Sequence, residues 1–368
     1  MSSLAGRGRL LAAALALGLL AGCVQPPPRD VRLTWLDATP PGVLPVSLAT
    51  SETGLIVSGT NEDDTAPAVA ALSGAAVPLV PSEPYAASAR IVATTSAAGR
   101  LYLIGGRAGG AHENTRWTVW DGPVAGPVTS RPQDFFTFGG HDAGPLLGTV
   151  VVDGSPLIVG SRGGDAGPDA ALYVATGTVW HQLDTPPTLH SANGVVLGFT
   201  AVASAGSLVV LVGDSVRADA TGTVQTPALF VGTVGGSWRR VDLPAPVSGP
   251  GLRHATSVTC DASSCWVAGW ASGRPRAWRV SLPDGAVVQT WTLPGEPPAT
   301  GDPVAVVAVV DGRPVVATNA AEPALAVMCA ARWTALSAPG PANALAGAGD
   351  DAYVVARDRL WRASLPPC

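Results

Sequence analysis

A hairpin pattern that recurs about every fifty residues is the feature that most limits the folds open to this chain. Residues 151–159 (VVDGSPLIV) and 309–317 (VVDGRPVVA) are near copies, 158 positions apart, which is about three repeat lengths. An apolar strand, a turn and a second strand ending near a small residue recur at Val57, Ile104, Val159, Val212, Val267, Val316 and Val355. This spacing, 39 to 55 residues between successive copies, predicts seven structural units.

Each of these hairpins precedes a second one, whose last strand often carries a tryptophan with a large apolar residue three positions later. The pairs are Trp117 with Trp120, Trp180 with Leu183, Trp238 with Val241, and Trp333 with Leu336. The 44 glycines and 34 prolines supply turns between short strands, and no helical periodicity is evident beyond residue 30. Seven units of four strands predict an all-β chain folded as a seven-bladed β-propeller of four-stranded antiparallel blades.

The last unit is incomplete, because residues 343–362 supply only about three strands. The segment 31–37, which contains Trp35 and Leu36, has the pattern of the missing strand. We therefore expect this N-terminal strand to complete the last blade and close the ring, which would leave few exposed sheet edges. The alternative is a pair of β-sandwich domains.

The blade pattern resembles that of kelch-type and sialidase-type propellers. The resemblance rests on Ile104-Gly105-Gly106 followed by Trp117, and on Gly236-Ser237-Trp238. It covers residues 31–368, although the full signature of neither family is present. It implies a propeller domain over that range.

The first residues have the pattern of an export signal. Arg7 and Arg9 precede an apolar run over 10–22, whose thirteen residues would form about 20 Å of helix, too short for a bilayer core of about 30 Å. The run ends in Leu-Ala-Gly-Cys at 20–23, which resembles the bacterial lipobox. The resemblance implies a signal peptide over 1–22, a mature protein beginning at Cys23 with diacylglycerol and palmitate-type acyl chains, and a proline-rich tether over 23–30. An ordinary secretory signal with a chance cysteine is the alternative.

Four further cysteines form an even set, as expected in an exported protein. Cys260 and Cys265 lie between two apolar runs, so a disulfide bond there would close a hairpin across its tip. Cys329 and Cys368 then pair by elimination. A metal half-site at Cys260 and Cys265 is the alternative, but the nearest histidine, His254, lies at an unsuitable spacing.

Ionisable side chains gather in two kinds of connection, from the second to the third strand of a unit and from one unit to the next. In a propeller both kinds lie on the same face, which we take as the candidate binding face. Its candidate residues are Arg107, His112, Glu113, Phe136, His141, Asp142, Arg162, Asp165, Asp214, Arg217, His254 and Arg274. The alternative is that loops are simply where polar residues must go.

The longest connection, 131–145, contains three of the five phenylalanines, Phe135, Phe136 and Phe138. These rings could lie over the axial channel and contact a ligand. The reading that we favour is that they anchor the long loop to its own blade.

Composition and motifs exclude some functions. A formal net charge of −5 without basic clusters provides no surface for binding nucleic acid phosphates. No cofactor or metal motif is present, and no pair of carboxylates can be singled out as a glycosidase site. We therefore expect a membrane-anchored, extracytoplasmic lipoprotein whose propeller is a non-catalytic binding or assembly module for a protein or glycan of the cell envelope. The alternatives are a propeller hydrolase or lyase acting on glycans, and a structural stabiliser of a membrane-protein assembly.

Overall fold

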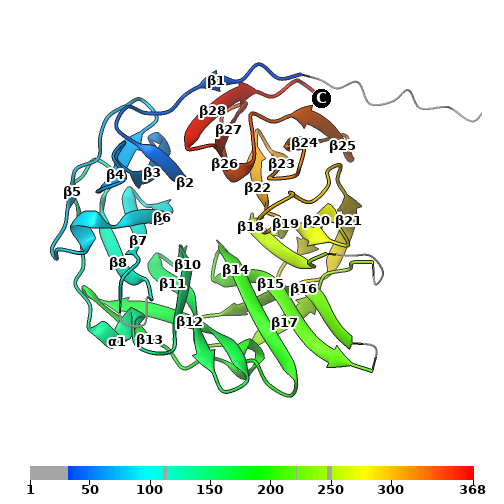
Figure 1. Cartoon of the computed structure of the whole chain (residues 1–368), viewed down its shortest axis with the longest axis horizontal. Coiled ribbons are helices and arrows are strands. Elements are labelled where there is room, and N and C mark those ends of the chain that lie inside the picture. Colours follow the sequence, from blue (N-terminus) through cyan, green and yellow to red (C-terminus); the bar gives the residue numbers. More distant parts are fainter. Residues whose placement is uncertain (1–31, 111–113, 221, 247–250) are drawn as a thin grey trace, which may run out of the picture.

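The computed structural model describes residues 32–110, 114–220, 222–246 and 251–368, and these form a ring of seven β-sheets (Figure 1). The prediction of a seven-bladed β-propeller is therefore confirmed. Blade 1 contains β2 (Leu44–Ser51), β3 (Gly54–Thr60) and β4 (Pro67–Ala71). Blade 2 contains β6 (Arg90–Ala97), β7 (Arg100–Arg107), β8 (Arg116–Pro123) and β9 (Val128–Ser130), and blade 3 contains β10 (Ala143–Val152), β11 (Ser155–Gly164), β12 (Gly167–Thr176) and β13 (Val179–Gln182).

The remaining four blades each have four antiparallel strands. Blade 4 contains β14 (Val195–Ala205), β15 (Leu208–Asp219), β16 (Gly222–Thr233) and β17 (Trp238–Asp242), and blade 5 contains β18 (His254–Cys260), β19 (Ser264–Ala271), β20 (Arg274–Ser281) and β21 (Val287–Thr292). Blade 6 contains β22 (Ala305–Val310), β23 (Arg313–Thr318), β24 (Ala324–Cys329) and β25 (Arg332–Ser337), and blade 7 contains β26 (Ala342–Ala348), β27 (Asp351–Ala356), β28 (Arg359–Ser364) and β1 (Leu36–Asp37). Short helices, η1 (Ala86–Ser88), α1 (Phe135–Phe138) and η3 (Pro187–Leu189), lie in the connections between blades.

The core of the described chain is divided among seven clusters, and each cluster fills the space between two neighbouring blades. Successive side chains of a strand point to opposite faces of its sheet. In β15, Leu211 therefore packs against blade 3, whereas Val212 packs against blade 5. The second strand of each blade reads as a continuous apolar run because both of its faces are buried. The seven repeat positions, Val57 to Val355, all lie in these second strands and are at most 1% exposed.

The first strands of the blades surround a central hollow of about 300 Å³. Hydroxyl groups of these strands donate hydrogen bonds to carbonyl groups of the next blade. Thr200 donates to Ala255 O at 2.6 Å, Thr256 to Ala305 O at 2.6 Å, and Thr95 to Thr149 O. These bonds tie neighbouring blades together at the axis.

The N-terminal strand closes the ring as expected (Figure 1). In β1, Leu36 pairs with Arg362 of β28, and the Asp37 carboxylate lies 2.6 Å from the Arg359 guanidinium. The strand is shorter than the expected 31–37, because the residues before it turn toward blade 6. There the Trp35 indole donates a hydrogen bond of 3.0 Å to Ser337 O, and its ring packs on the cluster between blades 6 and 7.

Blades 1 and 2 depart from the regular pattern. β5 (Leu79–Val80), which follows blade 1, pairs in parallel with β9, the outer strand of blade 2. Trp117 and Trp120, which we placed in a last strand, lie instead in β8, the third strand of blade 2. The last strand, β9, has only three residues and no tryptophan, so the sequence pattern marked the wrong strand of this blade.

Both predicted disulfide bonds are present. Cys260–Cys265 joins the first two strands of blade 5 across their turn, and Cys329–Cys368 fixes the C-terminal residue to β24. Among the described residues, no helix is long and apolar enough to cross a membrane.

We expect Trp35→Ala to lower the free energy of unfolding by about 1–3 kcal/mol, because it removes a half-buried ring and a hydrogen bond that hold the closing strand. Leu36→Ala is the matched control, since the side chain of the neighbouring Leu36 is 58% exposed, and it should change stability by less than about 0.5 kcal/mol. Urea denaturation of the full-length protein measures both. Equal effects of the two substitutions would contradict the closing role of Trp35.

Candidate binding cleft between blades 2 and 3

The two kinds of connection share one face of the ring. Because strands alternate in direction, the connections from second to third strands and from blade to blade all lie on that face. The structure places in or beside these connections Arg107, Phe136, His141, Asp142, Arg162, Asp165, Arg217, His254 and Arg274, whereas Asp214 lies within β15, paired with Pro227. His112 and Glu113 lie outside the described residues, as do Cys23 and the predicted signal and tether.

Several of these residues make local contacts in separate blades. His141 Nδ1 lies 3.0 Å from Asp142 Oδ1, and both side chains are exposed. Asp214 accepts a hydrogen bond of 2.9 Å from Gln225, and burial raises the pKa of its carboxyl group. Arg274 lies 3.5 Å from Glu296. The face therefore holds scattered small groups, and they do not converge on the axis.

The long connection 131–142 lies at the rim of the ring, where α1 packs against blade 3 (Figure 1). Phe138 is 5% exposed, and its ring meets Tyr173 edge-on at 4.9 Å, next to Trp180. Arg162 donates hydrogen bonds to the carbonyl groups of Phe136 and Gly139 at 3.5 and 3.4 Å. Of the three phenylalanines that we expected to anchor the connection, only Phe138 does so, whereas Phe135 and Phe136 are exposed, and none of the three lines the central hollow. Arg162 is part of this anchor.

A concave feature that combines aromatic and charged groups lies beside α1, between blades 2 and 3. It is a cleft of about 360 Å³. Its lining residues are Glu83, Tyr85, Gly110, Asn114, Thr115, Arg116, Trp117, Arg131, Gln133, Asp134, Phe135, Phe138, Gly139 and Gly140. Four aromatic side chains and six side chains with planar polar groups therefore surround one hollow.

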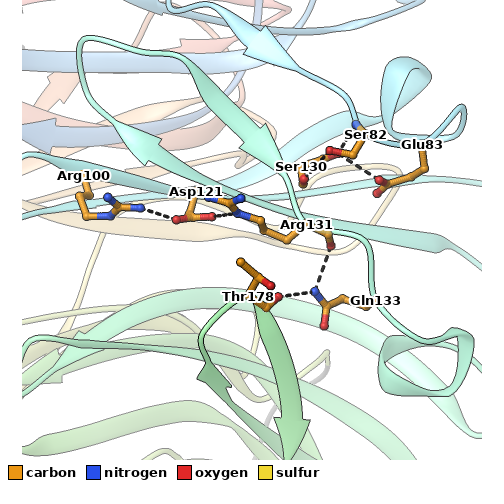
Figure 2. A network of polar contacts seen from close by, with 8 residues as sticks. All are labelled: Ser82, Glu83, Arg100, Asp121, Ser130, Arg131, Gln133 and Thr178. Carbon is orange, nitrogen blue, oxygen red and sulfur yellow. Dashed lines mark hydrogen bonds and ion pairs between the residues drawn. The ribbon is translucent and has the colours of Figure 1, made fainter.

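A network of polar contacts fixes both sides of the cleft to blade 2 (Figure 2). Asp121 of β8 bridges Arg100 and Arg131. On the other side, Ser82 N donates to Ser130 Oγ at 2.7 Å, and Ser130 Oγ donates to Glu83 at 3.2 Å. The segment with Glu83 and the connection that begins at Arg131 are thus both held against the outer strands of one sheet.

Gln133 joins this network to blade 3. Its side-chain amide donates to Arg131 O at 3.1 Å and to Thr178 O at 2.9 Å (Figure 2). Its oxygen accepts from Trp180 N at 2.8 Å. The amide thus pairs with the outer edge of β13 as a peptide group of another strand would. This contact blocks that edge locally and fixes the width of the cleft.

Trp117 is held firmly in the wall of the cleft. A Cβ at Gly106, its partner in β7, would lie 3.0 Å from Trp117 Cε3 and 2.6 Å from Thr115 Cγ2, so the ring requires glycine beneath it. The indole nitrogen donates a hydrogen bond of 3.2 Å to Gly144 O. The glycine and this bond together set the position of a half-buried aromatic ring.

Glu83, Tyr85 and Arg116 form the polar part of the wall. Burial raises the pKa of the Glu83 carboxyl, and the Ser130 hydroxyl opposes this shift. Burial also raises the pKa of Tyr85, with a further contribution from the Glu83 charge, while the Arg116 charge lowers it. Within the described part of the chain, the Arg116 side chain has no hydrogen-bond or ion-pair partner. A carboxylate and a guanidinium group are therefore available to a ligand.

Sequence reasoning missed Glu83, Tyr85, Arg116 and Trp117 as site residues. Glu83 and Tyr85 follow β5, and the exchange of that strand to blade 2 brings them to the cleft. The signal that could have indicated the site was Gly106. A glycine inside a strand often marks a close approach to the backbone, and here the Trp117 ring lies against it.

Comparisons with known proteins support the fold alone. No protein-family model and no curated protein sequence matches the chain. Among solved structures, the chain is similar to Kuenenia stuttgartiensis hydrazine synthase, with 8% identity, a TM-score of 0.51 and coverage of 94% of this chain and 99% of that one. It is also similar to the Dos1 propeller, with 9% identity, a TM-score of 0.46 and coverage of 91% and 95%. For BamB from Moraxella catarrhalis the identity is 9%, the TM-score 0.47 and the coverage 87% and 82%.

A histidine on the same face gives a pH-dependent contact. His190 Nδ1 lies 2.7 Å from Asp169 Oδ2, and its Nε2 lies 2.9 Å from Thr185 O. Hydrogen bonding to Asp169 raises the pKa of His190. The protonated imidazole donates both bonds, so this contact contributes stability below the unfolded-state pKa of about 6.5 and loses it as pH rises through the folded-state value.

We expect a double-mutant cycle of His190→Gln and Asp169→Asn to give a favourable coupling at pH 5.5 that falls as pH rises to 8.5. The coupling should stay below about 1 kcal/mol, because the His190 side chain is 41% exposed. Urea denaturation at both pH values measures it. A coupling that is constant or grows with pH would show that the charged pair does not stabilise the fold.

Proposed function

We propose that this chain is an exported lipoprotein whose propeller is a non-catalytic binding module of the cell envelope. It is anchored through Cys23 and contacts its partner through the face that carries α1. The propeller supplies a rigid frame, and the irregular connections of blades 1 to 3 supply the contact surface.

The two disulfide bonds support export, because such bonds are typical of oxidising compartments outside the cytoplasm. The residues Leu20-Ala21-Gly22-Cys23 support lipid anchoring through their likeness to the lipobox. Two or more acyl chains give stable membrane attachment, whereas a single chain gives only reversible binding.

The observation that carries the binding proposal is the pair of exposed rings on α1. Phe135 is 56% exposed and Phe136 is 71% exposed, and they meet edge-on at 5.1 Å beside the cleft. Exposing two phenylalanine rings to water on a short helix that Phe138 anchors is unfavourable in free energy, and a partner that covers the rings would remove this penalty. Rigid aromatic side chains next to a pocket are also the usual anchors of binding sites.

The engagement of the cleft's polar groups supports a binding role without catalysis. Asp134 accepts a hydrogen bond of 2.9 Å from Phe136 N and thereby caps α1, and Arg131 is paired with Asp121. Gln133 uses both ends of its amide in internal contacts. Most of the charged and amide groups thus hold the cleft in shape.

Lipid anchoring predicts that the mature protein begins at Cys23 and is heavier than its polypeptide by the mass of the acylated diacylglycerol. Mass spectrometry of the protein from membranes tests this. Cys23→Ala should abolish the added mass and release the protein from the membrane fraction. An unchanged mass together with retained membrane fractionation would refute the anchor.

Binding through α1 predicts that p-benzoylphenylalanine placed at position Phe136 of the full-length protein forms photo-crosslinks in cells of the native host. The matched control is the same group at Val309, which is 44% exposed and lies beside a turn of the opposite face. Crosslinked material should appear at position 136 and be at least several-fold weaker at position 309. Equal crosslinking at both positions, or none at either, would count against this face, and chemical turnover of the captured partner would count against a non-catalytic role.

A further inference from the structure

We propose that the cleft between blades 2 and 3 binds the pyranose rings of a neutral oligosaccharide, with Trp117 as the stacking platform. This inference rests on the proposed function, because it names the ligand class of the same face. Four observations support it: the fixed position of the Trp117 ring, the polar groups beside that ring, a second hollow next to the cleft, and the partly paired sheet edges around it.

The platform is already formed in the structure. Gly106 lies against the six-membered ring of Trp117, and the bond to Gly144 O fixes the indole edge. The ring also packs on the apolar cluster between blades 2 and 3, and the part of the indole that stays exposed borders the cleft and is the surface that a ligand would contact. The C–H groups on one face of a pyranose ring pack well on such a flat, apolar surface, and a rigid platform loses little entropy on binding.

The polar groups beside the platform suit vicinal hydroxyl groups. Arg116 presents a planar set of donors, and Glu83 presents acceptor oxygens of which one is engaged by Ser130. The Asn114 amide donates to Gly140 O at 3.2 Å, which leaves its oxygen as an acceptor. Planar carboxylate, amide and guanidinium groups can each contact two neighbouring hydroxyl groups at once.

Charge favours an uncharged ligand. Among the described lining residues, two guanidinium groups, Arg116 and Arg131, balance two carboxylates, Glu83 and Asp134, so these residues together carry no net formal charge. A strongly anionic or cationic polymer would find no net attraction there. A neutral sugar, which combines many hydroxyl groups with apolar C–H faces, fits this balance.

A second hollow adjoins the cleft and offers room for a further sugar ring. It has a volume of about 340 Å³ and is lined in part by Ala143, Gly144 and Pro145. Asn114, Thr115 and Trp117 line both hollows. Because Trp117 borders both, neighbouring rings of an oligosaccharide could contact it from the two hollows.

The sheet edges beside the cleft favour a glycan over an extended peptide. A peptide commonly binds by adding a strand to an open sheet edge. Here β5 covers β9, the outer strand of blade 2, and the Gln133 amide occupies the edge of β13. A peptide would therefore find the edge of β9 and the backbone groups of Thr178 and Trp180 already engaged, and only the two-residue strand β5 as an edge of blade 2.

The test is binding of the full-length lipoprotein, in a detergent without sugar headgroups, to an array of neutral and acidic pyranose oligosaccharides. Calorimetry with the strongest neutral ligand follows. We expect a neutral oligosaccharide of at least two rings to bind, and Trp117→Ala to weaken its binding on the order of tenfold or more. Trp117→Phe should retain part of the affinity. Arg116→Gln, which removes a guanidinium group that makes no hydrogen bond or ion pair within the described residues, should weaken binding while leaving the melting temperature unchanged.

Trp266→Ala is the matched control, because Trp266 is a half-buried tryptophan between blades 5 and 6, and it should leave the affinity unchanged. No binding to any neutral sugar would overturn the inference, as would binding that Arg116→Gln and Trp117→Phe leave unaltered. If the cleft bound a peptide library instead, the sugar assignment would fail. Crosslinking to a protein at position 136 without sugar binding would leave the proposed function standing and refute this inference alone.

Discussion

Burial of both faces of every sheet is the constraint on which the rest of this structure depends. Each blade is covered on both faces by its neighbours. In β15, Leu211 is buried against blade 3 and Val212 against blade 5, and alternate side chains are buried in the same way around the ring. An open array would leave two such faces in water at its ends. The ring must therefore close, and the short strand β1 with Trp35 gains its importance from this requirement rather than from its own few contacts.

The candidate cleft arises where the repeat is broken. Five blades follow one pattern, whereas blade 1 passes its last strand to blade 2, and the connection between blades 2 and 3 is lengthened by α1. The first departure carries Glu83 and Tyr85 to the outer strands of blade 2, and the second brings Phe135 and Gln133 opposite them. The regular blades thus form a rigid framework, and the two irregular segments carry the polar and aromatic residues of the candidate cleft.

Much of the fold could be predicted from the sequence, because it is encoded by local patterns. The apolar positions from Val57 to Val355 mark second strands, and the cysteine spacing marks the hairpin at Cys260. The candidate cleft could not be predicted, because its residues meet only through an exchange of β5 between sheets and through side chains that face each other across blades. Trp117 is an example. The sequence pattern identified this tryptophan as a blade residue but assigned it to the outer strand, whereas it lies in β8. The true outer strand, β9, has only three residues, which is too short to give a recognisable alternating pattern.

The position of β1 also determines how an anchored molecule would be presented. The strand lies on the outer edge of blade 7, across the ring from α1 (Figure 1). Nine residues from Cys23 to residue 31 reach at most about 30 Å. In a protein tethered at Cys23, the rim of blade 7 would stay near the lipid headgroups, and the rim of blades 2 and 3 would be free to turn outward. The same ring closure that stabilises the fold would thus place the cleft on a part of the ring distant from the tether.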